Sequence, residues 1–254
     1  MRKLSEKLEL VAVILFVVVC HILKGPADKA DCFVKTHRSP GPDSSGNSFH
    51  AIYSALREGA TTIKMEVMVS DSGQILISHN PVTHQGYTHR KPLLGALIDS
   101  VENYVASSGI DLPAYTIEVQ PNSSSEPNSM QLSASSLNQI INLVYEKSIV
   151  ERVSVQSFEL PHLQHLNRHH PDIGTSLLVD QSELKSVDHI IDELGFVPQV
   201  ISPHYSLVDP ELVTVCHNKG IKVIPWIVND RNMINMLKEL GVDGIITDFP
   251  HLFN

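Results

Sequence analysis

Six side chains in the first half of the chain combine residue types that enzymes use for chemistry. They are two imidazoles, two carboxylates and two cationic side chains: His37 and His79, Glu66 and Glu118, and Arg38 and Lys64. Imidazoles and carboxylates can move protons, and fixed cations can stabilise negative charge on a bound group. A packed core does not tolerate so many charged groups without compensation. Brought together by a fold, these six residues would form a catalytic or anion-binding site.

The stretch Thr62 to Asn80 is central to this group of residues. Apolar residues alternate there with Lys64 and Glu66 in the period of two that is typical of a strand. A turn at Asp71-Ser72-Gly73 leads into a second short strand and then to His79. Lys64 and Glu66 therefore share one strand face, and an imidazole returns beside it. An alternative is that both face solvent, as charged residues on a strand often do.

Composition limits the classes of protein that the chain can belong to. Its 254 residues suit one large domain or two small ones, and 42% hydrophobic with 19% charged residues permit a substantial core. The net charge of -9 argues against a nucleic-acid surface. The three cysteines, Cys20, Cys32 and Cys216, have no paired spacing, so neither a zinc site nor a disulfide framework is indicated.

The first thirty residues have the pattern of an export segment. Basic residues at positions 2, 3 and 7 precede the apolar run Leu10–Cys20, which is short for a membrane span and typical of a signal-peptide core. We expect residues 1–30 to be a signal peptide or, alternatively, an N-terminal membrane anchor, and residues 31–254 to be the folded domain. Either alternative predicts an exported protein that is periplasmic, attached to the cell surface or secreted. An anchor would also associate the domain with a membrane.

From Cys32 onward, short apolar strands alternate with amphipathic helices, which indicates a parallel sheet. Eight strands are expected, the second with a hairpin extension: residues 32–36, 61–79, 115–119, 152–158, 175–179, 200–203, 222–228 and 244–247. Helices are expected at residues 47–58, 93–108, 133–147, 160–169, 183–194, 210–219 and 231–240. The even spacing of these repeats predicts a (β/α)₈ TIM barrel rather than an open sheet. No GxGxxG or GxxxxGK[ST] motif occurs, so a nucleotide-binding sheet lacks its signature.

In a barrel of this kind, the chemistry is located at the C-terminal ends of the strands. Residues with functional side chains fall at these ends in the predicted strands, and besides the six named above they are Gln120, Gln156, Ser157, Phe158, His204, Tyr205, Trp226, Asn229 and Asp248. The barrel would therefore collect the charged residues of three neighbouring strands at one end of the molecule.

Several motifs resemble those of the glycerophosphodiester phosphodiesterase family, and in particular its exported bacterial branch. They are the His-Arg pair after the first strand, GATTIKMEVMVSDSGQILISHN, TIEVQ, RVSVQSF, PHYSLV, GIKVIPWIVND and GVDGIITDFP. The resemblance extends from about Lys35 to the end of the chain. It implies a TIM barrel that hydrolyses glycerophosphodiesters or related lipid head-group phosphodiesters. It also implies two histidines as general acid and base, and a divalent cation, Ca²⁺ or Mg²⁺, held by carboxylates.

Matching the motifs position by position assigns roles to individual residues. The resemblance implies that His37 and His79 are the catalytic pair and that Arg38 binds phosphate. One imidazole would take a proton from the nucleophile, either water or a neighbouring hydroxyl of the substrate, and the other would give a proton to the leaving alkoxide. Trp226, with Phe158, would form an apolar wall against a glycerol or lipid-like group; an alternative is that both aromatic rings pack at the barrel mouth.

The chain departs from the family pattern where the family binds its metal. The paired carboxylates of I-E-x-D become Ile63-Lys64-Met65-Glu66, H-D becomes His79-Asn80, and E-I-K becomes Glu118-Val119-Gln120. Glu66 and Glu118 remain as metal carboxylates, with the ammonium of Lys64 beside them. A divalent cation would lie close to that ammonium, which is unfavourable in a low-dielectric site. We therefore expect metal binding to be weak or absent, or to occur only when phosphate is present, with Lys64 itself supplying positive charge towards phosphate.

Three functions remain open on the sequence alone. His37 and His79 favour a phosphodiester hydrolase. Lys64, Asn80 and Gln120 favour a catalytically degenerate barrel that binds a phosphorylated ligand or a partner. A third alternative is a sugar-phosphate lyase that uses Lys64 to form a Schiff base.

Overall fold

The structure is a computed structural model that describes the backbone of residues 31–35 and, with side chains, residues 49–70, 72–77, 92–119, 133–182 and 185–253. The chain divides after Ala30 into two units, and every described residue belongs to the unit Asp31–Asn254. Strands and helices alternate along this unit. The strands are β1 (Asp31–Lys35), β2 (Thr62–Val69), β3 (Ile75–Ile77), β4 (Ala114–Val119), β5 (Val153–Ser157), β6 (Gly174–Val179), β7 (Val200–Pro203), β8 (Lys222–Val223) and β9 (Gly244–Thr247). The helices are α2 (Phe49–Arg57), α3 (Leu94–Ser108), α4 (Ala134–Glu146), α5 (Leu160–His169), α6 (Val187–Leu194), α7 (Pro210–Asn218) and α8 (Arg231–Glu239).

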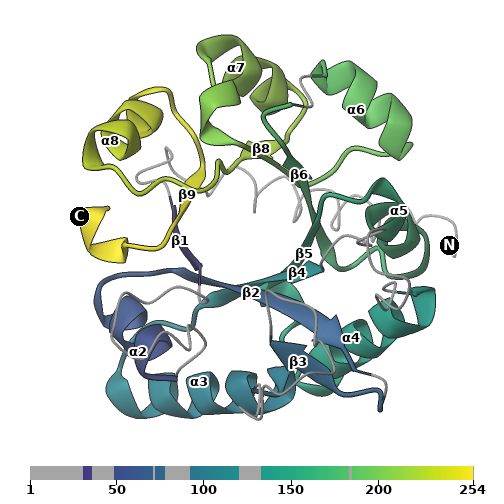
Figure 1. Ribbon diagram of the computed structural model, residues 1–254, viewed down its shortest axis with the longest axis vertical. Coiled ribbons are helices and arrows are strands. Elements are labelled where there is room, and N and C mark those ends of the chain that lie inside the picture. The colour runs from purple at the N-terminus through teal and green to yellow at the C-terminus, as the bar shows by residue number, and fades with distance from the viewer. Residues whose placement is uncertain are drawn as a thin grey trace, which may run out of the picture. The chain divides into compact units, whose positions relative to one another are not determined.

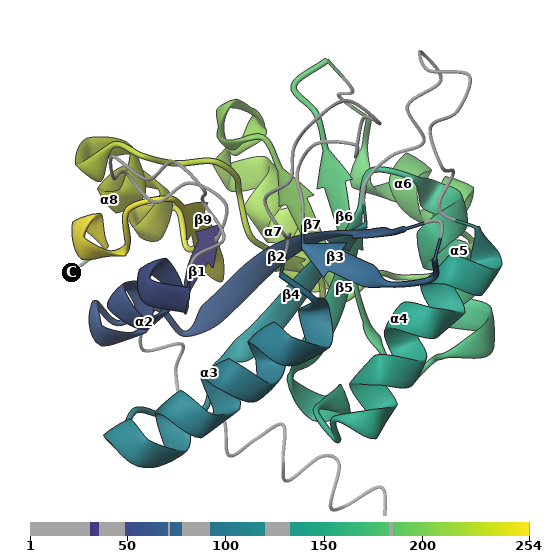
Figure 2. The ribbon, with the colours of Figure 1, turned by 60° about the horizontal axis from the view of Figure 1, so that its bottom comes forward.

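The parallel strands form a closed ring with the helices on its outside (Figure 1). Their order is β8-β7-β6-β5-β4-β2-β1-β9, and β3 pairs antiparallel with the end of β2 (Figure 2). Backbone hydrogen bonds join the two ends of this order. The N–H of Asp243 donates to the carbonyl of Val223 at 3.0 Å, and the N–H of Val228 donates to the carbonyl of Ile246 at 2.9 Å. The predicted (β/α)₈ barrel is confirmed.

One predicted strand is much shorter in the structure. The sequence predicts a strand over residues 222–228, but β8 ends at Val223. Pro225 lies in the remainder and has no N–H to donate, so a regular ladder cannot continue through it. The segment still pairs with its neighbours, because Trp226 forms an isolated parallel bridge with His204.

The helix boundaries follow local sequence signals. Asp209 and Asp230 precede α7 and α8, and their carboxylates accept hydrogen bonds from backbone N–H groups in the first turns, at 2.7 and 2.9 Å. Such caps satisfy donors that have no partner within the helix. Gly195 ends α6 with φ 77°, a left-handed conformation that glycine adopts without a steric penalty. Among the described residues, no helix is long and apolar enough to cross a bilayer.

The two faces of the strands have different environments. On β2, Ile63, Met65 and Val67 belong to the main hydrophobic cluster, and all three are buried. Burial of each such side chain contributes about 1.5–3 kcal/mol relative to exposure. The alternating residues Lys64 and Glu66 point to the opposite face, the interior of the barrel, because neighbouring side chains on a strand face opposite ways. The hydrophobic cluster therefore fixes the face to which the charged residues point.

Candidate functional site

Lys64, Glu66 and Glu118 lie inside the barrel and are almost completely buried. Their exposed fractions are 3%, 2% and 5%, so the alternative that Lys64 and Glu66 face solvent is wrong. The alternation of charged and apolar residues in β2 is compatible with charged side chains on either the solvent face or the interior face. Closure of the sheet into a ring decides between them, because a closed ring has an inner face that strand side chains must fill.

One ammonium contacts both carboxylates in this group, which we call the interior charge cluster (Lys64, Glu66 and Glu118). Lys64 Nζ donates a hydrogen bond to Glu118 Oε2 and lies 3.6 Å from Glu66 Oε1. The parallel ladder explains the geometry, because Glu66 is in register with Glu118 whereas Lys64 is in register with Thr116. The lysine side chain therefore reaches along the strand direction to the next layer. The two carboxylates converge on one point instead of pointing apart.

Polar side chains continue from this cluster onto the next two strands. Gln156 on β5 is in register with Glu118, and its Nε2 donates to Ser176 Oγ on β6 at 3.1 Å. One layer below, the hydroxyls of Thr116 and Ser154 lie 3.2 Å apart. The Oε1 atom of Gln156 is buried and accepts no hydrogen bond within the described part of the chain. The barrel interior is therefore polar across β2, β4, β5 and β6.

The sequence predicts that Gln156 lies at a strand end but does not indicate that Ser176 is its partner. The polar residues Thr175 and Ser176 within β6 are the available signal. The pairing itself depends on the register between β5 and β6, where Gln156 faces Ser176.

Aromatic rings meet at the C-terminal ends of β5, β7 and β8, which we call the barrel mouth. Phe158 and Trp226 form an edge-to-face pair with ring centroids 5.6 Å apart, and His204 contacts Trp226 in the same manner at 5.4 Å. Trp226 Nε1 donates to the carbonyl of Ser202 at 2.8 Å, which fixes the indole orientation. Both Phe158 and Trp226 are partly exposed. The aromatic pair therefore packs at the barrel mouth, as one of the two interpretations expects. Its role as an apolar wall for a ligand stays a prediction.

A polar pair connects the loops that follow β8 and β9. Asn229 Nδ2 donates to Asp248 Oδ2 at 2.8 Å, and Asn229 Oδ1 accepts from the backbone N–H of Asp248 at 3.0 Å. Thr247 Oγ1 donates to the same amide oxygen at 3.1 Å. Asn229 and Asp248, which the sequence placed at strand ends, therefore hold the last two loops together.

The remaining predicted site residues lie outside the described residues. They are His37, Arg38, His79, Asn80 and Gln120. The catalytic histidine pair and the phosphate-binding arginine therefore stay predictions, whereas the interior charge cluster and Trp226 have defined positions.

The described residues do not fit a divalent cation between Glu66 and Glu118. The ammonium of Lys64 already lies against both carboxylates. Two unit charges about 4 Å apart repel by about 4 kcal/mol at an effective dielectric constant near 20, and a divalent ion doubles that term. Among the described residues, no group of three His, Cys, Asp or Glu side chains has the arrangement needed to hold a metal.

A TIM barrel with charged groups towards the C-terminal ends of its strands has the architecture of an enzyme or of a ligand-binding relative of one. Residues 100–252 match the model of the glycerophosphoryl diester phosphodiesterase family, and the chain belongs to this family.

Similar proteins carry related names. The chain is 32% identical over 111 residues to a glycerophosphodiester phosphodiesterase of Caldanaerobacter subterraneus subsp. tengcongensis, a match that covers 44% of each chain. It is 26% identical over 104 residues to a glycerophosphodiester phosphodiesterase of Bacillus subtilis, covering 41% of this chain and 36% of the relative. The chain thus spans less than half the length of these two relatives in the matched segments.

Solved structures share the fold at low sequence identity. A glycerophosphodiester phosphodiesterase from Parabacteroides distasonis aligns with a TM-score of 0.68 at 19% identity, covering 87% of this chain and 94% of that one. A phosphodiesterase from Oleispira antarctica, in complex with the product sn-glycerol-3-phosphate, aligns with a TM-score of 0.67 at 16% identity, covering 88% and 95%.

Proposed function

We propose that this protein is a phosphoric diester hydrolase that cleaves glycerophosphodiesters or related lipid head-group phosphodiesters. The observation that carries the proposal is the interior charge cluster: Lys64 and Glu66 from the middle of β2 and Glu118 from near the C-terminal end of β4 are buried together inside the barrel. Membership of the glycerophosphoryl diester phosphodiesterase family supports the reaction class. The Oleispira antarctica structure, whose product is sn-glycerol-3-phosphate, supports a small phosphate ester as ligand.

The proposed mechanism uses two imidazoles and two cations. One of His37 and His79 takes a proton from the nucleophile, either water or a neighbouring hydroxyl of the substrate, while the other protonates the leaving alkoxide. Arg38 and Lys64 stabilise negative charge on the phosphoryl oxygens. Trp226 contacts the apolar surface of the glycerol or lipid-like group, which its partial exposure at the barrel mouth permits.

The proposed metal requirement is altered relative to the family pattern. Glu66 and Glu118 are the carboxylates that would face a divalent cation, Ca²⁺ or Mg²⁺, which would neutralise phosphate charge when bound. We propose that binding of this ion is weak or absent, because Lys64 Nζ contacts both carboxylates.

The proposed domain organisation follows from the sequence. Residues 1–30 are a signal peptide or an N-terminal membrane anchor, and residues 31–254 form the barrel. The protein is then exported, in the periplasm, at the cell surface or secreted, as in the exported bacterial branch of the family. A retained anchor would hold the barrel close to its lipid-derived substrates.

A release assay tests the hydrolase proposal. Glycerophosphocholine and lysophosphatidylcholine are incubated with wild type, His37→Ala and His79→Ala, each in EDTA and in added Ca²⁺ or Mg²⁺. We expect each histidine variant to lose at least about 10²-fold in rate, the lower range for a general acid or base. His217→Ala is the matched control, because His217 lies at the C-terminal end of α7, away from the barrel mouth. Equal product from wild type and both histidine variants would exclude the catalytic assignment.

A second candidate is a barrel without catalysis that binds a phosphorylated ligand. The position of Lys64 between two carboxylates favours it, because the family pattern has a carboxylate there. The chain contains one tryptophan, Trp226, so its fluorescence reports on the barrel mouth without interference from another indole. Saturable quenching by sn-glycerol-3-phosphate without product release from any substrate would support the binding protein over the hydrolase.

A further inference from the structure

Lys64 gives the interior charge cluster a positive charge that is covalently attached to the barrel, whereas a free cation can dissociate. The ammonium is carried by β2, whose neighbours β1 and β4 are both paired to it through backbone ladders. Glu66 is on the same strand, and Glu118 is in register with it on β4. All three groups are therefore held by the sheet. A tethered charge competes with free ions at an effective concentration in the millimolar range or above.

Burial of the cluster makes it harder for a free cation to displace the ammonium of Lys64 from the two carboxylates. The three side chains are at least 94% buried, so a cation that entered between the carboxylates would have to lose its water and displace or approach the ammonium. Mg²⁺ gives up its water reluctantly, and Ca²⁺ requires six to eight oxygen ligands. The described cluster offers two carboxylates, and both are already in contact with Lys64.

We propose that Lys64 is a built-in counter-ion that takes the place of a divalent cation and keeps Ca²⁺ and Mg²⁺ out of the barrel. The polar interior then has its positive charge at all times, and binding of a phosphate ester is independent of free divalent ions. This deepens the proposed function, on which it rests only for the identity of the ligand. Residue 64 is thus the position that determines the metal requirement of the site.

Calorimetric titration with CaCl₂ and MgCl₂ tests the proposal on four proteins: wild type, Lys64→Arg, Lys64→Met and Lys64→Asp. Wild type and Lys64→Arg, which keep the positive charge, are expected to show no saturable binding. Lys64→Asp adds a third carboxylate, and Ca²⁺ affinity rises with the number of charged ligands. We expect it to bind Ca²⁺ at least about tenfold more tightly than Lys64→Met, which removes the charge without adding a ligand. Its unfolding midpoint should then rise on addition of Ca²⁺, because a ligand that binds only the folded state stabilises it.

If Lys64→Asp does not fold, titration of wild type with Ca²⁺ and Mg²⁺ still tests the proposal. Saturable Ca²⁺ or Mg²⁺ binding to wild type that disappears in Glu118→Gln would overturn it. Titration of wild type with sn-glycerol-3-phosphate, followed by Trp226 fluorescence, provides a second readout. Equal dissociation constants in EDTA and in CaCl₂ support the proposal, and tenfold tighter binding in CaCl₂ contradicts it. Absence of any binding of sn-glycerol-3-phosphate would count against the proposed function, while calorimetry would still decide the exclusion of metal.

Discussion

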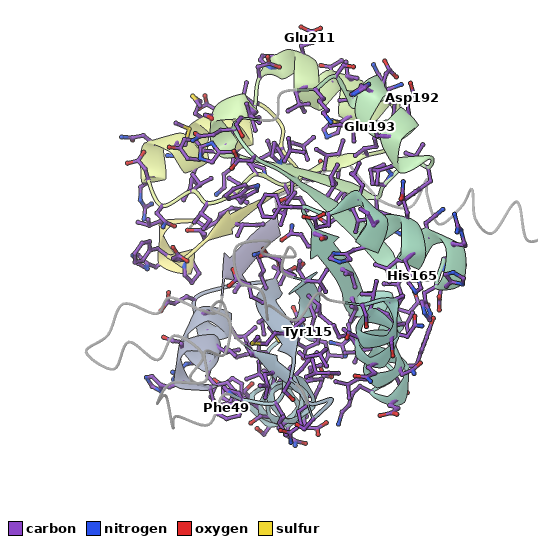
Figure 3. The ribbon with its side chains drawn as sticks, turned by 45° about the vertical axis from the view of Figure 1, so that its right-hand side comes forward. Phe49, Tyr115, His165, Asp192, Glu193 and Glu211 are labelled. Carbon is purple, nitrogen blue, oxygen red and sulfur yellow. The ribbon has the colours of Figure 1, made fainter. Side chains whose placement is uncertain are left out.

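The barrel contains two charged clusters that have similar side chains but differ in charge balance and in exposure. The interior charge cluster has one ammonium for two carboxylates inside the ring. The second, which we call the outer cluster, consists of Arg152 before β5, Glu102 on α3 and Tyr115 on β4, the last of which is labelled in Figure 3. The Arg152 and Glu102 side chains keep 25% and 29% of their surfaces exposed.

In the outer cluster, charges and hydrogen bonds are matched. Arg152 donates to both carboxylate oxygens of Glu102, at 3.0 and 2.8 Å, and to the carbonyl of Pro113 at 2.6 Å. Tyr115 donates its hydroxyl to the same carboxylate at 2.5 Å, and the guanidinium lies over its ring. Such an arrangement joins α3 to β4 and to the turn before β5, and it requires no ligand.

Among the described residues, the interior charge cluster has one ammonium for two carboxylates, so its charges are not matched in this way. Its described members carry a formal charge of −1 at very low exposure, a state that folding alone would not favour. The balance of positive and negative charge distinguishes the two clusters. The partly exposed pair with equal charges is structural, whereas a buried group with unequal charges indicates a functional site. Three measurements test this distinction, and a fourth concerns a histidine outside both clusters.

The largest effect is expected from Lys64→Met. Removing the ammonium leaves Glu66 and Glu118 buried beside each other, and the loss of one partner from a buried ion pair costs about 3–5 kcal/mol. Urea unfolding at pH 7 should show a loss of this size in the free energy of unfolding. A loss below about 1 kcal/mol would mean that the ammonium does not compensate these carboxylates, because only exposed ion pairs have effects that small.

Arg152→Met should have a smaller effect. The guanidinium is partly solvated, so its loss removes charge-assisted hydrogen bonds to Glu102 that are partly replaced by water. We expect a decrease of about 1–2 kcal/mol in the free energy of unfolding. The same urea experiment measures it, and an effect equal to that of Lys64→Met would remove the contrast between the clusters.

Acid should weaken the outer cluster over a defined range. Burial raises the pKa of Glu102, but hydrogen bonds from Arg152 and Tyr115 and the charge of Arg152 outweigh burial and leave the pKa below its usual value of 4.5. A depressed carboxyl pKa contributes stability above the unfolded pKa, and this contribution is lost as the pH falls through the folded pKa. Glu102→Gln should therefore destabilise the protein by up to about 1 kcal/mol at pH 7 and by progressively less below pH 4.5. Urea unfolding curves at pH 7 and below pH 4.5 compare the variant with wild type. A difference that does not depend on pH would contradict a lowered pKa for Glu102.

The smallest effect concerns His165, which lies on α5 on the outside of the ring (Figure 3). Burial lowers its pKa below 6.5, and the neighbouring positive charges of His169, His170, Arg168 and His162 lower it further. A histidine with a lowered pKa favours the neutral form, so its contribution to stability is present above pH 6.5 and decreases as the pH falls below that value.

His165→Gln removes this titration and can keep a hydrogen bond to Asn138, whose side-chain oxygen lies 2.9 Å from His165 Nε2. The variant should show a shallower decrease in stability between pH 6.5 and 5, by a few tenths of a kcal/mol, as for other partly exposed electrostatic contributions. Thermal unfolding across this range measures the slope. An unchanged slope would assign the pH dependence to other groups.

The sequence predicts much of the fold because its signals are local. Leu160–His169 and Gly244–Thr247 have the predicted boundaries, as does β7. The error in β8 also has a local cause, because the prediction extended the strand through Pro225. The spacing of apolar residues and the residues that cap helices therefore determine where helices and strands lie along the chain.

The candidate site is only partly predictable for a physical reason. Alternation shows that Lys64 and Glu66 share a face, but the choice of face depends on ring closure. The hydrogen bond from Lys64 to Glu118 joins residues 54 positions apart and depends on strand register. The bond from Arg152 to Glu102 depends in the same way on tertiary packing, and no local pattern indicates it.

The pairing of β1 with β9 has a consequence for how the molecule is made. Cys32 and Phe33 lie beside Ile245 and Ile246, so β1 has β9, the last strand of the ring, as one of its two neighbours. On a ribosome that synthesises about 5–20 residues per second, β9 is made after all the other strands of the ring, so the ring cannot close until β9 has emerged. Contacts of such long sequence separation slow folding.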